Sequence, residues 1–175
     1  KGKNTKFLPF NKDIENPINP SGHKASYLWE EVLTQNNILN LIQNYVFIQE
    51  REEGSKDDKE IKYDLIFPRY HQFNVINKIK SDIVINDVGK KYLIQHTTGS
   101  GKSLTIAWLT YKLSNLFKSK DSLNKIFDTV IVLTDRKVLD KQLRNTILQL
   151  QQVEGVVNPV TKDSQELKKF IESGK

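Results

Sequence analysis

A glycine-rich stretch at residues 97–103, Thr-Thr-Gly-Ser-Gly-Lys-Ser, constrains the fold of this chain more than any other feature. It fits the end of the pattern G-x-x-x-x-G-K-[ST], the P-loop or Walker A motif. Glycines let the backbone turn tightly, so that successive N–H groups face inward and can bind an anion. A helix that begins at Lys102 brings its positive dipole end to the same point. Because a P-loop joins a strand to a helix, the stretch predicts an α/β fold.

The hydrophobic pattern around this stretch predicts alternating strands and helices. Short apolar runs at residues 92–94 and 130–133 are expected to be strands, and residues 156–157 are expected to open a third. Helices are expected at residues 103–117, 139–150 and 164–171. This order is typical of an α/β domain with a parallel sheet, whose strands become fully apolar because helices cover both faces.

The residue types of the P-loop each suit the binding of a nucleotide. Lys102 would reach the β- and γ-phosphates of ATP, and Ser103 would offer its hydroxyl to Mg²⁺. His96 stands at the first glycine position of the pattern and is expected to be structural. The candidate ATP-binding residues here are Thr98, Gly99, Ser100, Gly101, Lys102, Ser103 and Leu104, with Lys102 as the catalytic residue. A plain Gly/Ser-rich loop is the alternative, and the expected strand and helix on either side argue against it.

Composition limits the kind of protein further. Hydrophobic residues make up 37% and the mean hydropathy is -0.53, which is typical of a soluble globular chain. The apolar runs are far shorter than the ~20 residues of a membrane span, so we expect a cytoplasmic protein without membrane contact. The absence of cysteine excludes disulfides and zinc–thiolate sites. The net charge of +6 suits a polyanionic partner, although a lysine-rich surface explains it equally well.

The expected organisation has three parts. Residues 1–25 are polar and contain several prolines, which predicts a linker or arm. Residues 26–68 predict two helices separated by a polar break at residues 35–37, then a hairpin with strands at residues 46–49 and 61–67 around a charged loop. The second helix is expected to begin near Ile38, with Leu39, Ile42 and Val46 on its apolar side. Residues 69–175 would form the α/β domain, opening with a helix that buries Phe73, Ile76, Ile79 and Ile83.

Residues 67–72, Phe-Pro-Arg-Tyr-His-Gln, resemble the Q-motif of superfamily 2 helicases, in which a glutamine reads the adenine edge. A Gln amide can pair with adenine N6 and N7 through two hydrogen bonds. The resemblance adds Arg69 and Gln72 to the candidate ATP-binding residues. Taken alone, Gln72 is more simply an exposed helix residue.

Residues 132–143 resemble motif Ia of the same superfamily, a strand-to-helix turn that touches the nucleic-acid backbone. Backbone N–H groups at a helix start, together with basic side chains, suit phosphate contacts. The candidate DNA-binding residues are Thr134, Asp135, Arg136 and Lys137. Asp135 is also expected to cap the helix.

Residues 7–12, 16–17 and 27–33 resemble the stretch that joins nuclease and motor in the R subunits of type I restriction enzymes. With the other motifs, the resemblance covers residues 7–150, most of the chain. It implies a truncated, RecA-like first motor domain that binds ATP and Mg²⁺. The whole protein would translocate double-stranded DNA while bound to modification and specificity subunits, and would cut DNA with an upstream nuclease. The first residue is Lys and the chain has no methionine, which we interpret as a piece of a longer protein.

Four other interpretations remain open at this point. The chain could belong to another superfamily 2 helicase, to a non-catalytic P-loop module, or to a P-loop kinase. Residues 60–62, Glu-Ile-Lys, also match part of a nuclease site, but such a site needs a separate Asp on a neighbouring strand. No Asp-Glu box follows residue 150, so we expect this chain alone to be inactive.

Overall fold

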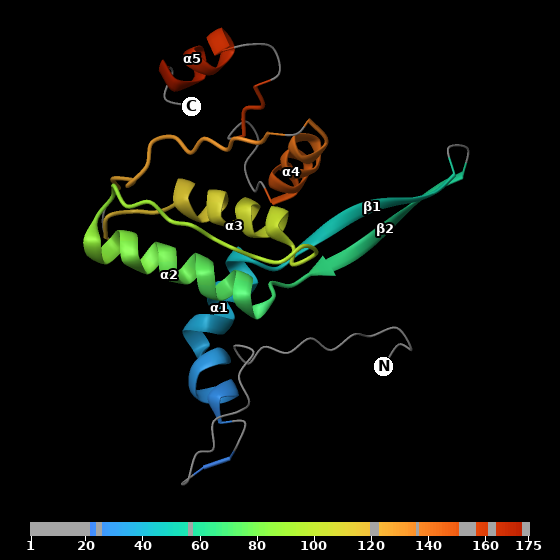
Figure 1. Ribbon diagram of the computed structural model, residues 1–175. Helices are drawn as coiled ribbons and strands as arrows, with labels where there is room; N and C mark the ends of the chain where they lie inside the picture. Colours follow the sequence, from blue (N-terminus) through green and yellow to red (C-terminus); the bar gives the residue numbers. More distant parts are fainter. Residues whose placement is uncertain are drawn as a thin grey trace. The chain divides into compact units, whose positions relative to one another are not determined.

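The computed structural model describes residues 22–23, 26–55, 58–119, 123–135, 137–150, 157–160 and 164–172 (Figure 1). The chain divides into two compact units, Lys1–Asn74 and Val75–Lys175. The helix α2 (Tyr70–Asn86) contains the boundary between them. Each unit is described below by its own contacts.

The first unit begins with a short π-helix, η1 (Leu28–Val32), and continues into α1 (Gln35–Asn44). The polar break predicted at residues 35–37 is wrong, because these residues form the first turn of α1. The helical residues that become buried are also not those predicted: Leu41 is 3% exposed, whereas Ile42 is 62% exposed. Tyr45, at the next position on the Leu41 face, is buried beside Phe73, with ring centroids 5.1 Å apart.

The predicted hairpin is confirmed and is longer than expected. Strand β1 (Phe47–Ser55) pairs antiparallel with β2 (Asp58–Ile66), from Phe47 opposite Ile66 to Ser55 opposite Asp58. Much of the charged segment that was predicted as a loop is therefore strand. Ion pairs between the strands explain this extension: Arg51 Nε lies 3.3 Å from Asp64 Oδ2, and Lys59 Nζ lies 2.7 Å from Glu52 Oε2. Such exposed pairs each contribute up to about 1 kcal/mol.

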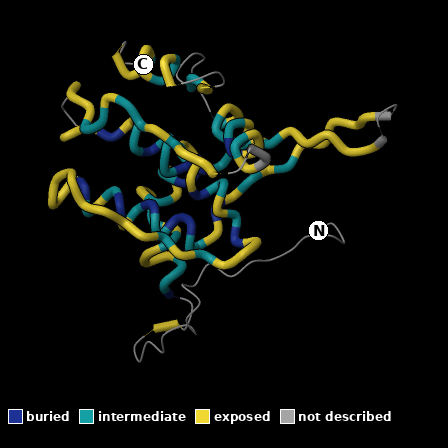
Figure 2. Tube along the Cα trace, turned by 45° about the horizontal axis from the view of Figure 1, so that its top comes forward, coloured by how far each residue is buried: buried dark blue, intermediate teal, exposed yellow. Residues whose placement is uncertain are grey.

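The second unit contains most of α2, followed by α3 (Lys102–Ser114), α4 (Lys137–Leu150) and α5 (Ser164–Glu172). These bounds confirm the helices predicted from apolar periodicity, with differences of a few residues at their ends. The predicted face of α2 is also confirmed, since Phe73, Ile76, Ile79 and Ile83 are all buried. Figure 2 shows the buried stretches along the helices in dark blue.

The core of the second unit joins α2 to α3. Ile79 and Ile83 of α2 pack with Leu116, which follows the end of α3. Partly buried apolar side chains surround this cluster: Val75, Ile94, Leu109, Leu113, Ile126 and Phe127. Ala107 and Trp108, in the middle of α3, have no exposed surface, and α3 packs against α4. Burying side chains of this size stabilises the fold by about 1.5–3 kcal/mol each.

The structure does not show the predicted parallel sheet. Within the described ranges, the strands are β1 and β2, and the apolar segments at residues 91–97 and 130–134 form no ladder. Their side chains include Leu93, which is 94% exposed, and Leu133, which is 84% exposed. The chain is thus of mixed helix and strand. Residue 156, where the third strand was predicted to begin, lies outside the described residues.

No helix in the described part of the chain is long and apolar enough to cross a membrane.

Candidate nucleotide-binding site

The glycine-rich stretch turns sharply into α3. Gly99 and Gly101 have φ angles of 76° and 82°, in the left-handed region that residues other than glycine rarely adopt. The Ser100 N–H donates to the Thr97 carbonyl over 3.3 Å and closes the turn. A Cβ at Gly99 would meet nothing within 4 Å, so the backbone conformation, and not lack of space, requires glycine there. The sequence motif therefore has the turn geometry that its glycines predict.

Helix α3 starts directly at this turn. Gly101 is its N-cap, and the Gly101 carbonyl accepts the first helical hydrogen bond from the Thr105 N–H over 3.1 Å. The first N–H groups of a helix have no partner within the helix and carry its positive dipole end. The first turn, which contains Ser103 and Leu104, has no acidic residue to compete for that end. An anionic ligand is the natural partner of such a terminus.

Lys102 is the first residue of α3, and its ammonium folds back over the turn. Nζ donates to the His96 carbonyl over 3.3 Å and to the Thr97 carbonyl over 3.0 Å. These carbonyls are neutral, so the full positive charge stays available at the mouth of the loop. The structure thus brings together the lysine, the left-handed glycines and a helix N-terminus. This combination can bind a phosphate group by charge and by backbone N–H donors.

Gln72 lies at the start of α2, in the first unit. It is only 2% exposed, so the simpler view of an exposed helix residue is wrong. Its Oε1 accepts a hydrogen bond from the backbone N–H of Arg69 over 2.7 Å. This is one half of a capping box, in which a Gln in the first turn satisfies the N–H of the residue before the helix. Gln72 therefore fixes the start of α2, and its role toward adenine stays a prediction.

The motif Ia residues lie just before and at the start of α4. The Thr134 hydroxyl donates to Asp140 Oδ1 over 3.5 Å, and Asp140 is also paired with Arg144. Helix α4 begins at Lys137, and the role of Asp135 as its cap stays a prediction. Arg136 and the side chain of Lys137 lie outside the described residues.

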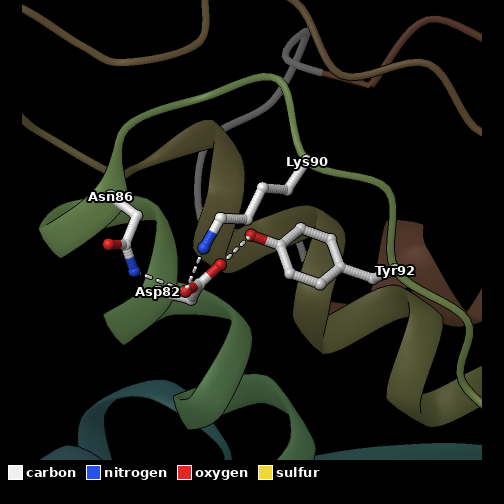
Figure 3. A network of polar contacts seen from close by, with 4 residues as sticks. All are labelled: Asp82, Asn86, Lys90 and Tyr92. Carbon is white, nitrogen blue, oxygen red and sulfur yellow. Dashed lines mark hydrogen bonds and ion pairs between the residues drawn. The ribbon is translucent and has the colours of Figure 1, made fainter.

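Two polar features of the second unit were not predicted. Asp82 of α2 collects hydrogen bonds from Asn86, Lys90 and Tyr92 (Figure 3). These residues are spread along a helix and the turn after it, so no linear motif marks them.

The other feature is Lys112 of α3, which is only 7% exposed. Burial, and secondly the positive charge of Lys80, lower the pKa of Lys112 to about 7. The helical spacing could have indicated the burial of Lys112, because it continues the helix face of Thr105 and Trp108, both of which are buried.

In the described part of the chain, no group of three or more His, Asp and Glu side chains is placed to hold a metal ion.

Comparison with known proteins gives the family to which this chain belongs. The family model of the SWI2/SNF2 ATPases matches residues 71–175, and the chain belongs to that family. The match begins beside Gln72 and includes the phosphate loop, α3 and α4. It argues against the P-loop kinase alternative.

One relative is similar to this chain over a longer stretch than the family model covers. The chain is 29% identical over 132 residues to a protein of Methanocaldococcus jannaschii that carries the provisional name of a type I restriction enzyme endonuclease subunit. The alignment covers 73% of this chain and 12% of the relative, so the chain spans only a small part of that protein's length. This confirms the resemblance to the R subunits of type I restriction enzymes. No solved structure matches the chain.

Proposed function

We propose that this chain is the ATP-binding part of the DNA-translocating, DNA-cleaving R subunit of a type I restriction endonuclease. The observation that carries the proposal is the turn at Gly99 and Gly101, which presents Lys102 and the N-terminus of α3 at one point. Membership of the SWI2/SNF2 ATPase family and the likeness to a restriction subunit support it.

In this proposal, the ligand of the loop is ATP with Mg²⁺. Residues 98–104 provide N–H groups for the phosphates, and Lys102 exchanges its two carbonyl partners for phosphate oxygens. Ser103 holds Mg²⁺ through its hydroxyl, and the ion, when bound, neutralises charge on the phosphates. Arg69 and Gln72 serve the adenine. These residues suit the ligand because they supply positive charge and donors and no carboxylate in the first turn of α3.

The proposed arrangement in the longer protein follows the three parts of the sequence. Residues 1–25 follow a nuclease domain, residues 26–68 lead into the motor, and residues 69–175 begin its first RecA-like domain, whose parallel sheet needs further strands. The partners are double-stranded DNA and the modification and specificity subunits, and the compartment is the cytoplasm. Another superfamily 2 helicase is less well supported, because the likeness to the restriction subunit covers most of this chain.

The proposed DNA contact gives a first prediction. Residues 134–137 approach phosphates and not bases, so DNA binding should be independent of sequence and should weaken steeply with salt. Changing Arg136 and Lys137 to Ala in the full-length subunit should reduce DNA-stimulated ATP hydrolysis, and the slope of log affinity against log salt should fall by about 2. Lys118→Ala with Lys125→Ala removes the same charge elsewhere in the chain and serves as the control. A double variant with wild-type stimulation and salt slope would contradict the motif Ia assignment.

Hydrolysis tests the proposal at the level of the whole chain. Transfer of the γ-phosphoryl group to water needs an oriented water and neutralisation of charge from both sides. This chain supplies Lys102 and Ser103, and we expect the remaining groups in other parts of the protein. Residues 1–175 should therefore show no phosphate release above background, even with Mg²⁺ and DNA, whereas the full-length subunit should show DNA-stimulated turnover that Lys102→Ala removes. Lys102-dependent turnover by residues 1–175 alone would overturn this placement.

A further inference from the structure

A polar cluster fastens the segment before the phosphate loop to the end of α2. Asp82 Oδ1 accepts hydrogen bonds from Asn86 Nδ2 over 2.7 Å and from Lys90 Nζ over 2.8 Å. Asp82 Oδ2 accepts a hydrogen bond from the Tyr92 hydroxyl over 2.7 Å. Figure 3 shows the three donors converging on this one carboxylate from the helix and from the chain that follows it.

The turn between α2 and Tyr92 is built to bring the chain back to Asp82. Asp87 follows the last residue of α2 and has a φ of 65°, the left-handed conformation that ends many helices. Gly89 has a φ of 105°, and the Val88 N–H donates to Asp87 Oδ1 over 2.8 Å. Two left-handed residues so close together reverse the chain direction within a few residues. Lys90 and Tyr92 consequently reach the helix one turn before its end.

Asp82 and Tyr92 keep their charge states at neutral pH. Hydrogen bonds from Lys90, Tyr92 and Asn86 lower the pKa of Asp82 to about 2, so its carboxylate stays ionised. The hydrogen bond to Asp82 raises the pKa of Tyr92, so its hydroxyl stays a donor. Asp82 and Tyr92 therefore keep the protonation states that their hydrogen bond requires.

The segment from Tyr92 to the phosphate loop is short and is held at successive points. Tyr92 is bound to Asp82, and Ile94 packs against the core cluster of Ile79, Ile83 and Leu116. The carbonyls of His96 and Thr97 then accept the hydrogen bonds of Lys102. The Asp82 cluster therefore attaches the start of the segment whose backbone carries these two carbonyls.

We infer that Asp82 is a positioning residue for the phosphate loop. By holding Lys90 and Tyr92 against α2, it fixes where residues 92–97 run along that helix. That position in turn sets where the loop places its N–H groups and Lys102. This inference rests on the proposed function, since it assigns Asp82 a part in binding nucleotide.

The test measures ATP affinity for the 175-residue chain well below its unfolding temperature. Asp82→Ala should bind ATP about three- to tenfold more weakly, a change typical of residues that act on a site through the fold. Asp82→Asn keeps an oxygen acceptor for Tyr92 and should recover part of the loss. Tyr92→Phe should weaken binding too, and its effect should not add to that of Asp82→Ala, because Asp82→Ala already removes the hydrogen bond to Tyr92. Asp64→Ala breaks a comparable exposed ion pair, with Arg51, and should leave affinity unchanged.

Amide hydrogen exchange without nucleotide supplies the second readout. Asp82→Ala should speed exchange several-fold at residues 93–101 and leave α4 unchanged. If exchange rises but ATP affinity stays at the wild-type value, Asp82 is only structural and the inference is wrong. Unchanged exchange would also overturn it.

A different result would contradict the proposed function, namely equal ATP affinity for the wild type and Lys102→Ala. In that case the exchange result alone decides whether Asp82 holds the loop.

Discussion

Replacing Lys102 with Ala should reduce the affinity of the chain for ATP by about 30- to 160-fold. This estimate follows from the loss of a hydrogen bond between charged groups, worth about 2–3 kcal/mol. The fold should be preserved, because Lys102 is exposed and its two hydrogen bonds go to backbone carbonyls of the adjacent loop. Isothermal titration calorimetry with ATP and Mg²⁺ measures the change directly.

Lys118→Ala is the matched control for this experiment. Lys118 is exposed and follows the C-terminal end of α3, whereas the phosphate loop precedes its N-terminal end. The substitution therefore removes the same charge at the opposite end of the helix. Its ATP affinity should equal that of the wild type. Equal affinity for the wild type and Lys102→Ala would show that the loop is not a phosphate site, whatever its turn geometry.

Replacing Trp108 with Ala should destabilise the chain by about 3–5 kcal/mol, the range for truncating a large buried aromatic residue. Trp108 has no exposed surface and lies in the middle of α3, the helix that carries Lys102 at its start. Chemical denaturation followed by circular dichroism measures the free energy of unfolding. A loss of this size leaves a small domain close to its unfolding threshold.

Trp29→Ala provides the comparison, because it makes the same change at a side chain that is 53% exposed. We expect the free energy of unfolding to fall by less than about 1 kcal/mol there, not counting the loss of the ring contact between Trp29 and His23. Similar losses for both variants would mean that Trp108 is not part of a packed core.

The parts of the fold that sequence reasoning predicted share one physical property. The helix face of α2 is made by apolar residues at helical spacing, and all four of its predicted residues are buried. On α4 the same spacing buries Leu143 but leaves Leu139 41% exposed. The full length of the hairpin could not be predicted in this way. Its outer half is held by ion pairs such as Lys59–Glu52, and alternating charges do not distinguish a strand from a solvated loop.

The candidate site divides along the same line. The turn of the glycine-rich loop could be predicted because it is made by consecutive residues, with glycines where φ must be positive. The Asp82 cluster could not, because its members come together only after the turn at Asp87 and Gly89 has formed. The burial of Gln72 was missed for a related reason: its carbonyl is used by the helix start, which the motif alone does not reveal.

The bare apolar segments beside the phosphate loop have a practical consequence. Leu93 and Leu133 are almost fully exposed on stretches that form no ladder, and unpaired backbone with apolar side chains is a template for pairing with another copy. The isolated chain should therefore self-associate as its concentration rises. Nucleotide titrations are best made dilute, where the stoichiometry of binding still refers to a monomer.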